Sequence, residues 1–367
     1  MNRSLLLEAF SSTSIPYGQL VVATEFIHPE RGIIQCLAAS PLAASLANSG
    51  RLVQMRKFRS QDVRTHSAGN DLFEESVLST ASFVDSTGRT AGLGIAAPVE
   101  DTRGLTSAQQ AIAEWSAQLR TRRVLLADPG RLCPVDNSCR EAVHNAAQSF
   151  AKMGDTVLWV GPASSMEQTL AQPYAQVETV HQARSLQVSN PTRLSFVLQP
   201  CTSVENALAI LKVLRERFPR LRGQHPDQWC YRQSDRWDSV RSVARTCDLL
   251  LIVGDASTEE ERDVKRAVVG ATCRVEVLAH PAELQCSWLF GAATVGIVPA
   301  VSCPSGAVPR LVDVLAGLGP VSVLHQQTST TVVSGAFVGE GRRRRSMIQP
   351  RAAYDARSSG WLPAHAS

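Results

Sequence analysis

Three cysteines share one local setting, in which a strand or turn precedes the cysteine and a helix-like segment follows it. They are Cys36 after PERGIIQ, Cys133 after LLADPGRL and Cys230 after HPDQW, and they are evenly spaced along the chain. Thiolates are the usual protein ligands of iron–sulfur clusters. Three thiolates from separate segments are enough to hold such a cluster, and they leave one iron free to bind a substrate.

A second interpretation of these residues needs no metal. Cys36 and Cys133 are then turn or core cysteines, and Cys230 is a buried neighbour of Trp229. Cys139 is a competitor for the place of Cys133, because it lies only about one and a half helical turns further along.

The chain has nine cysteines, and we do not expect them to form a disulfide framework. The N-terminus lacks a long apolar stretch and a small-residue cleavage site, and no apolar run is long enough to cross a bilayer. We therefore expect a soluble, cytoplasmic protein whose thiols stay reduced. Cys247 and Cys273 flank strand-like runs, and these two cysteines and Cys286 are predicted to be small buried apolar residues.

The elements that must position the three cysteines alternate between strands and helices, which predicts βαβ units and mainly parallel sheets. The expected strands are Leu20–Ala23, Val124–Ala127, Val157–Val160, Leu194–Leu198, Leu249–Val253, Val275–Leu278 and Val295–Val298. The expected helices are Pro41–Asn48, Ser107–Leu119, Arg140–Met153, Val204–Phe218, Asp235–Arg245, Glu259–Val269 and Val308–Leu318. The run from Thr202 to Glu205 fits a capping box in front of its helix.

Composition shifts divide the chain into five segments. We expect an N-terminal arm, three α/β lobes and a tail that lacks order, with bounds at 1–18, 19–121, 122–190, 191–320 and 321–367. At 44% hydrophobic residues the chain can bury several cores. The net charge of +4 is mild, and Arg342–Arg345 supply four positive charges in the tail. This balance argues against nucleic acid as a partner.

The order of these elements resembles the 4-hydroxy-3-methylbut-2-enyl diphosphate reductases, or LytB proteins. The resemblance is strongest in RLSFVLQPCTSVENALAILKVLRERFP, DQWCYRQSDRWDSV, DLLLIVGDAS and VGIVPAVSCPSGAVPRLVDVLAGLG. It is weak over the first 120 residues, where PERGIIQC occupies the position of the family's first cysteine and the turn before it. The resemblance implies three pseudo-symmetric α/β lobes around a central [4Fe–4S] cluster, and an electron donor such as a ferredoxin or flavodoxin.

The resemblance also implies roles for single residues. Cys36, Cys133 and Cys230 would be the cluster ligands. Glu167, in GPASSMEQ, would relay protons to a departing hydroxyl, although an ordinary surface glutamate fits the same sequence. Ser302 would hydrogen-bond a diphosphate, or alternatively form a turn or a helix cap.

Several positions depart from the family. Arg59, Pro98 and Ser165 stand where the family has diphosphate-binding histidines. An arginine can still pair with phosphate oxygens, whereas the proline side chain has no hydrogen-bond donor. The family's threonine pair is Pro200-Cys201 here, so we expect the neighbouring Thr202 to contact the substrate.

The family's serine–serine–asparagine phosphate site is replaced by Thr258-Glu259-Glu260. Two carboxylates facing a diphosphate would repel it, unless they point into solvent as the first turn of a helix. Two hypotheses follow: a reductase that removes the hydroxyl of an allylic diphosphate in isoprenoid biosynthesis, and an iron–sulfur paralogue that has lost the diphosphate pocket. A cluster-free α/β scaffold is a third.

Overall fold

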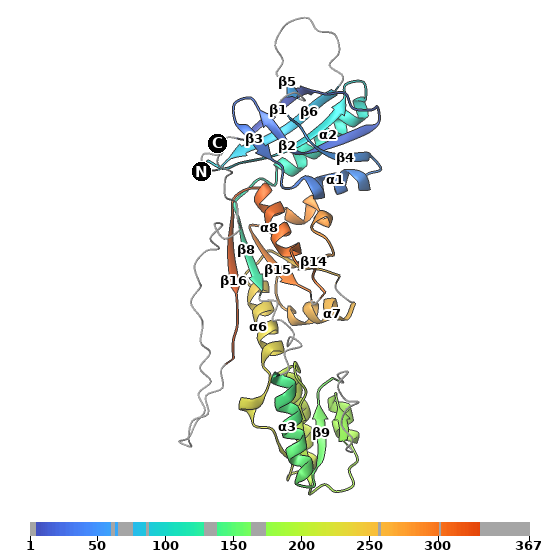
Figure 1. The fold of residues 1–367 in the computed structure, drawn as a ribbon, viewed down its shortest axis with the longest axis vertical. Coiled ribbons are helices and arrows are strands. Elements are labelled where there is room, and N and C mark those ends of the chain that lie inside the picture. Colours follow the sequence, from blue (N-terminus) through green and yellow to red (C-terminus); the bar gives the residue numbers. More distant parts are fainter. Residues whose placement is uncertain are drawn as a thin grey trace, which may run out of the picture. The chain divides into compact units, whose positions relative to one another are not determined.

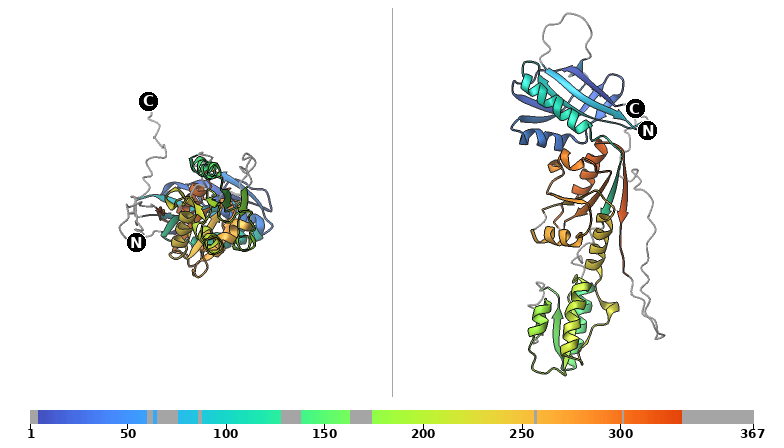
Figure 2. Two further views of the ribbon diagram at one scale, coloured as in Figure 1. Left: turned by 90° about the horizontal axis from the view of Figure 1, so that it is seen from below. Right: turned by 180° about the vertical axis from the view of Figure 1, so that it is seen from behind.

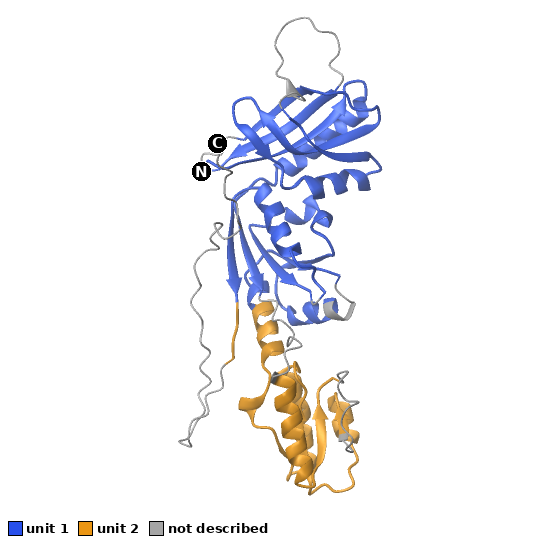
Figure 3. Cartoon of the chain, viewed as in Figure 1, with its two compact units in different colours: residues 1–127, 242–326, 350–367 blue, residues 128–241, 327–349 orange. Residues whose placement is uncertain are grey.

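The chain divides into two compact units, which we describe separately (Figure 3). Unit 1 comprises residues 1–127, 242–326 and 350–367, and unit 2 comprises residues 128–241 and 327–349. The computed structural model describes residues 5–59, 63–64, 76–85, 88–127, 138–162, 174–255, 258–300 and 302–330 (Figure 1). Over these ranges, no helix is both long enough and apolar enough to span a membrane.

The N-terminal part of unit 1 forms a seven-stranded sheet. Its strands are β1 (Leu6–Ser12), β2 (Gln19–His28), β3 (Gly32–Gln35), β4 (Leu52–Lys57), β5 (Val63–Arg64), β6 (Ser76–Val84) and β7 (Thr90–Pro98). They lie in the order β4-β2-β3-β7-β6-β1-β5. Most pairs are antiparallel, and only β2–β4 and β3–β7 are parallel.

Two helices pack against this sheet. Helix α1 (Ala39–Asn48) contacts β2 and β4, and α2 (Thr102–Ser116) lies against β6 and β7 (Figures 1 and 2). Helix α2 starts five residues before the predicted Ser107, because the Asp101 carboxylate accepts a hydrogen bond from Gly104 N at 2.8 Å and caps the helix.

The other part of unit 1 is a five-stranded sheet in which every strand is parallel. It holds β8 (Arg122–Ala127), β13 (Leu249–Val253), β14 (Arg274–Leu278), β15 (Thr294–Pro299) and β16 (Val321–Gln326). The order is β14-β13-β15-β8-β16. Helices α7 (Thr258–Ala267) and α8 (Ala307–Gly317) connect its strands. One hydrophobic core joins both sheets of unit 1, since residues such as Phe26, Trp115 and Leu251 belong to the same buried cluster.

Unit 2 is built on a four-stranded parallel sheet, in the order β10-β9-β11-β12. Its strands are β9 (Thr156–Val160), β10 (Tyr174–Val177), β11 (Leu194–Leu198) and β12 (Arg222–Gly223). Its helices are α3 (Ser138–Lys152), α4 (Val180–Ser185), α5 (Val204–Arg217) and α6 (Arg232–Ala244), of which α6 ends beyond the boundary of the unit.

The α/β class predicted from the sequence is confirmed, and each expected strand and helix coincides with an observed one. The three sheets are not alike, since two are wholly parallel and the N-terminal one is mainly antiparallel. Residues 321–326, placed by the sequence in a tail without order, form β16. This strand pairs along its whole length with β8, and its Val321 and Val323 pack on the core of unit 1. Residues 6–12, within the expected N-terminal arm, form β1.

Candidate functional site

The carboxyl edge of the four-stranded sheet carries the best-defined group of predicted site residues. Parallel strands end at the same edge of a sheet, and ligands of α/β proteins bind outside that edge. Gly161 follows β9, Thr202 follows β11, and Cys230 follows β12 after the short turn Pro226–Gln228. Thr202 and Cys230 are therefore brought to one edge of unit 2.

The loop before Cys230 is fixed by the side chain of Gln224. This buried amide accepts a hydrogen bond from Leu198 N at 3.2 Å and donates one to Gln228 O at 3.2 Å. The indole of Trp229 donates to Gln224 O at 3.1 Å and lies in the core of the unit. Cys230 is consequently held next to a core residue and is half-buried.

Thr202 has a buried hydroxyl without a hydrogen-bond partner among the described residues. The residue is 4% exposed, and Ser203, not Thr202, caps α5 by accepting from Asn206 N. The predicted capping box is therefore wrong by one residue, and the Thr202 hydroxyl is left for another partner. It lies so close to Gly161 that a side chain there would collide with it. An orphaned buried hydroxyl at a sheet edge is an observation that fits a bound ligand.

Cys201, which replaces a family threonine, has a φ of 58° and is the one non-glycine residue with positive φ among those described. The left-handed region is strained for a residue with a Cβ. Such strain is concentrated at functional sites in proteins, and here it lies directly beside Thr202.

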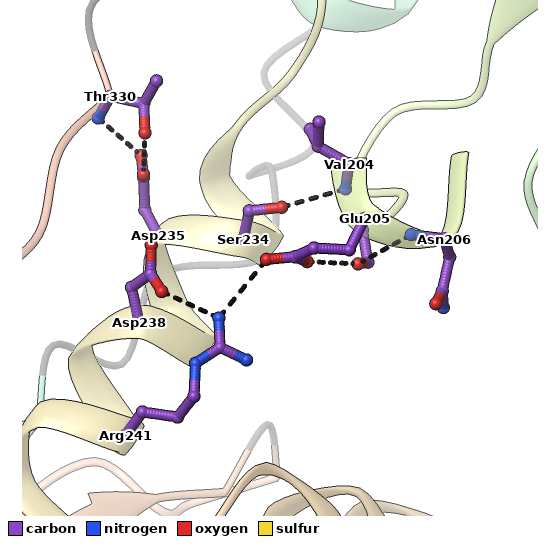
Figure 4. A network of polar contacts seen from close by, with 9 residues as sticks. Val204, Glu205, Asn206, Ser234, Asp235, Asp238, Arg241 and Thr330 are labelled. Carbon is purple, nitrogen blue, oxygen red and sulfur yellow. Dashed lines mark hydrogen bonds and ion pairs between the residues drawn. The ribbon is translucent and has the colours of Figure 1, made fainter. Parts of the chain in front are cut away.

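The first turns of α5 and α6 are occupied by the chain's own side chains (Figure 4). The Ser234 hydroxyl accepts from Val204 N at 2.9 Å and so joins the two helix starts. The Asp235 carboxylate accepts two hydrogen bonds from Thr330, from N at 3.2 Å and from Oγ1 at 2.6 Å.

One arginine in this network binds two carboxylates. Arg241 contacts Glu205 at 3.3 Å and Asp238 at 2.7 Å (Figure 4). Asp235, bound by Thr330, is a third carboxylate of this region, and Arg232 and Arg236 add two further positive charges at the start of α6. Acidic side chains therefore lie near the positive ends of both helices, where they would compete with an anionic ligand.

Ser302 lies at the carboxyl edge of the five-stranded sheet, in unit 1. Its hydroxyl donates to Asp255 O at 2.5 Å and thereby ties the loop after β15 to the loop after β13. Helix α8 has Gly306 as its N-cap, without a side-chain capping bond. Of the two structural roles expected for Ser302, the turn is confirmed and the helix cap is wrong.

Cys36 follows β3 and is 3% exposed, inside the core of unit 1. Its N donates to Thr24 O at 2.9 Å, and its O accepts from Ala39 N at 3.0 Å. Burial raises the pKa of this thiol far above its ordinary value, and the nearby Glu25 carboxylate raises it further. A positive charge beside the sulfur, such as that of a metal ion, would favour the loss of the thiol proton.

Unit 1 does not bring Cys36 and Ser302 together. The backbone of Ala38 packs against Gly317, at the carboxyl end of α8, so closely that a Cβ on this glycine would lie 2.9 Å from Ala38 N. Ser302 precedes the amino end of the same helix. A helix of 11 residues spans about 16 Å, and this length separates the neighbourhood of Ala38 from that of Ser302.

The two basic residues at the end of β4 have partners of their own. The Arg56 guanidinium lies 4.7 Å from the centre of the Phe58 ring and donates to Thr13 Oγ1 at 2.8 Å, and Lys57 pairs with Glu25 at 3.6 Å. The predicted substrate residue Arg59 follows them and is exposed.

Cys133, Ser165 and Glu167 lie outside the described residues. Cys139 is half-buried at the start of α3, and Pro98 is buried at the end of β7. In the described ranges, no three histidine, cysteine, aspartate or glutamate side chains gather closely enough to bind a metal ion. Cys36 lies in unit 1 and Cys230 in unit 2, and thiols are the kind of ligand that suits an iron–sulfur cluster.

The acidic replacement for the family's phosphate site is part of a helix. Helix α7 begins at Thr258, so Glu259 and Glu260 lie in its first turn, as one of the two interpretations predicts. Sequence reasoning missed Gln224, Ser234 and the Asp235–Thr330 contact. None of these positions carries a motif, because their roles come from partners distant in the sequence.

Comparison with known proteins places this arrangement in a family. Residues 120–316 match the family model described as LytB protein, which is more than half of the chain. The chain belongs to the LytB family. The matched range begins after α2, and it therefore includes the two parallel sheets up to α8 and excludes the seven-stranded sheet.

Two curated relatives are 4-hydroxy-3-methylbut-2-enyl diphosphate reductases. The enzyme of Dechloromonas aromatica is 36% identical over 149 residues, which cover 41% of this chain and 49% of the relative. Reductase 1 of Mycobacterium tuberculosis is 27% identical over 215 residues, which cover 56% of this chain and 65% of the relative. The chain thus spans about half to two thirds of these relatives. The solved reductase of Plasmodium falciparum is 15% identical with a TM-score of 0.42, covering 60% of this chain and 74% of its own.

Proposed function

We propose that this protein is a LytB-type reductase that removes the hydroxyl group of 4-hydroxy-3-methylbut-2-enyl diphosphate. The reaction consumes two electrons and two protons, and it releases water with isopentenyl and dimethylallyl diphosphates. The observation that carries the proposal is the family match over both parallel sheets, which includes Cys230 and the orphaned hydroxyl of Thr202 at one sheet edge.

In this proposal Cys36, Cys133 and Cys230 hold a [4Fe–4S] cluster, which supplies the electrons and a Lewis-acidic iron. Glu167 gives a proton to the departing oxygen, and the Thr202 hydroxyl hydrogen-bonds the substrate. Ser302 and Arg59 contact the diphosphate. A ferredoxin or flavodoxin delivers electrons in the cytoplasm, where thiols stay reduced.

A second candidate is an iron–sulfur paralogue that no longer binds a diphosphate. Two observations favour it. Glu205, Asp235 and Asp238 place three carboxylates near the helix starts at the carboxyl edge of unit 2, and Pro98 is a buried strand residue where the family has a histidine. Such a protein would keep the cluster for redox sensing or for another substrate.

Anaerobic reconstitution with iron and sulfide separates these candidates. We expect about four irons per chain, because a [4Fe–4S] cluster contains that number. We also expect the reconstituted protein to form product from the allylic diphosphate when reduced ferredoxin supplies electrons. In Cys230→Ser we expect both to be lost, whereas Cys139→Ser serves as a matched control on a cysteine outside the ligand set.

A cluster without turnover would contradict the reductase and support the paralogue. A wild-type chain that retains no iron or sulfide would contradict both and leave a cluster-free scaffold. Full metal content in Cys230→Ser with loss in Cys139→Ser would show that the assignment of ligands is wrong.

A further inference from the structure

Two thiols outside the proposed ligand set meet at the amino edge of the five-stranded sheet. Cys247 precedes β13 and Cys273 precedes β14, and these strands are parallel neighbours with Leu249 opposite Arg274. Arg274 N donates to Asp248 O at 3.1 Å, so the pairing continues up to the two cysteines. Both are free, and the two thiols lie close enough for each to affect the pKa of the other.

The surroundings of the two thiols differ. Cys247 is 5% exposed and lies over β15, where a Cβ on Gly296 would come 3.0 Å from its sulfur. Cys273 is partly exposed. A small oxidant from solvent therefore reaches Cys273 first, and Cys247 is the protected thiol beside it.

The two thiols also differ in acidity. Burial raises the pKa of Cys247 to about 12, and the negative charge of an ionised Cys273 raises it as well. Burial also raises the pKa of Cys273, whereas its interaction with Cys247 lowers it. Cys273 is therefore the thiol that ionises more readily.

We propose that Cys247 and Cys273 are a redox-active dithiol, in which Cys273 reacts with a peroxide and Cys247 resolves the product to a disulfide. The Cys273 thiolate attacks one peroxide oxygen, the O–O bond breaks, and Cys273 sulfenic acid and water form after proton uptake. The Cys247 sulfur then displaces the sulfenic oxygen as a second water. Two thiols lose two electrons and two protons, and one hydrogen peroxide becomes two waters.

The disulfide encloses one β13–α7–β14 unit, from Cys247 to Cys273. The cross-link limits the freedom of this segment in the unfolded chain, which stabilises the fold. Asp255, whose carbonyl binds Ser302, lies within the enclosed segment. Because both thiols ionise less readily than a free cysteine, the reaction is slow and responds to prolonged oxidant exposure.

The test uses the full chain after metal removal with a chelator, so that its result is independent of the proposed cluster. The protein is incubated with hydrogen peroxide, remaining thiols are alkylated, and proteolytic peptides are identified by mass spectrometry. We expect a Cys247–Cys273 linkage that dithiothreitol reverses, and a rise of the unfolding midpoint of unit 1 on the order of 5 °C.

Cys273→Ser should abolish the linkage and leave Cys247 reduced, whereas the matched control Cys286→Ser should retain it. If a variant fails to fold, the proposal is decided by the disulfide linkages that mass spectrometry identifies in the wild-type protein. Separate recovery of both alkylated cysteines overturns the proposal, as does oxidation of Cys273 to a sulfinic acid without linkage to Cys247.

Discussion

The seven-stranded sheet and the two parallel sheets differ both in pairing and in their relation to the family. The parallel sheets lie in the matched range except for β16, and one of them presents Cys230 and Thr202 at its carboxyl edge. The seven-stranded sheet is mainly antiparallel, lies outside the match, and buries Cys36 in its core. The comparison teaches that Cys133 and Cys230 lie within the range that matches the family, whereas Cys36 is a proposed ligand outside it.

The largest effect is expected for Cys36→Ser. If the N-terminal region supplies a ligand, cluster content should fall nearly to zero, as in Cys230→Ser, because two thiolates hold a four-iron cluster poorly. Iron and sulfide analysis after anaerobic reconstitution measures this. Retention of the full cluster in Cys36→Ser would show that the two regions do not share a metal site.

Trp115→Ala tests whether the antiparallel and parallel sheets of unit 1 depend on one core. Trp115 is 1% exposed in the buried cluster that also contains Leu251. We expect a loss of about 3–5 kcal/mol in the free energy of unfolding, with both sheets melting together in denaturant titrations. The exposed Gln110→Ala on the same helix is the control. Separate transitions for the two sheets would contradict a shared core.

Asp155→Ala should destabilise unit 2 by about 2–3 kcal/mol. The fully buried carboxylate binds Arg222 at 2.5 and 2.6 Å and accepts a hydrogen bond from Ser195. Half of the Arg222 side chain is exposed, so this group can return to water and the cost stays moderate. Thermal unfolding followed by a probe in unit 2 measures the change, with Asp263→Ala, from an exposed ion pair of α7, as control. An equal effect of both variants would argue against the burial of Asp155.

The smallest effect is expected for Thr330→Ala. The substitution removes the exposed hydrogen bond from Thr330 Oγ1 to Asp235 and keeps the one from the backbone N, so it should cost about 0.5–1 kcal/mol in the free energy of unfolding. Amide exchange at the start of α6 should rise in this variant and remain unchanged in Ser329→Ala. Unchanged exchange in Thr330→Ala would mean that the contact does not hold the helix start.

The sequence predicts the parallel part of the fold well because its strands are continuous apolar runs, such as Leu249–Val253, separated by amphipathic helices. It predicts the antiparallel part poorly. Strands such as β6, with the sequence SVLSTASFV, carry small polar residues that are buried only through pairing with distant strands. The sequence does not predict β16 for a similar reason, because this strand forms by pairing with the distant strand β8.

At the candidate site, residue types could be predicted and their environments could not. The half-buried state of Cys230 depends on Gln224, which binds Leu198 of the neighbouring strand β11. The orphaned hydroxyl of Thr202 depends on whether Thr202 or Ser203 caps α5, since both residue types are common helix caps. The proximity of Cys247 and Cys273 depends on the order of strands in the sheet.

The position of β8 has a consequence for how the chain folds during synthesis. Its two neighbours, β15 and β16, follow it by well over 150 residues, and the whole of residues 128–241 is inserted before the first of the other strands. Unit 2 can therefore complete its own sheet while β8 still has both hydrogen-bonding edges open. Long-range pairing of this kind is slow and leaves strands exposed. A chain that stops before residue 321 would leave β8 as an apolar edge, and we expect it to aggregate rather than refold.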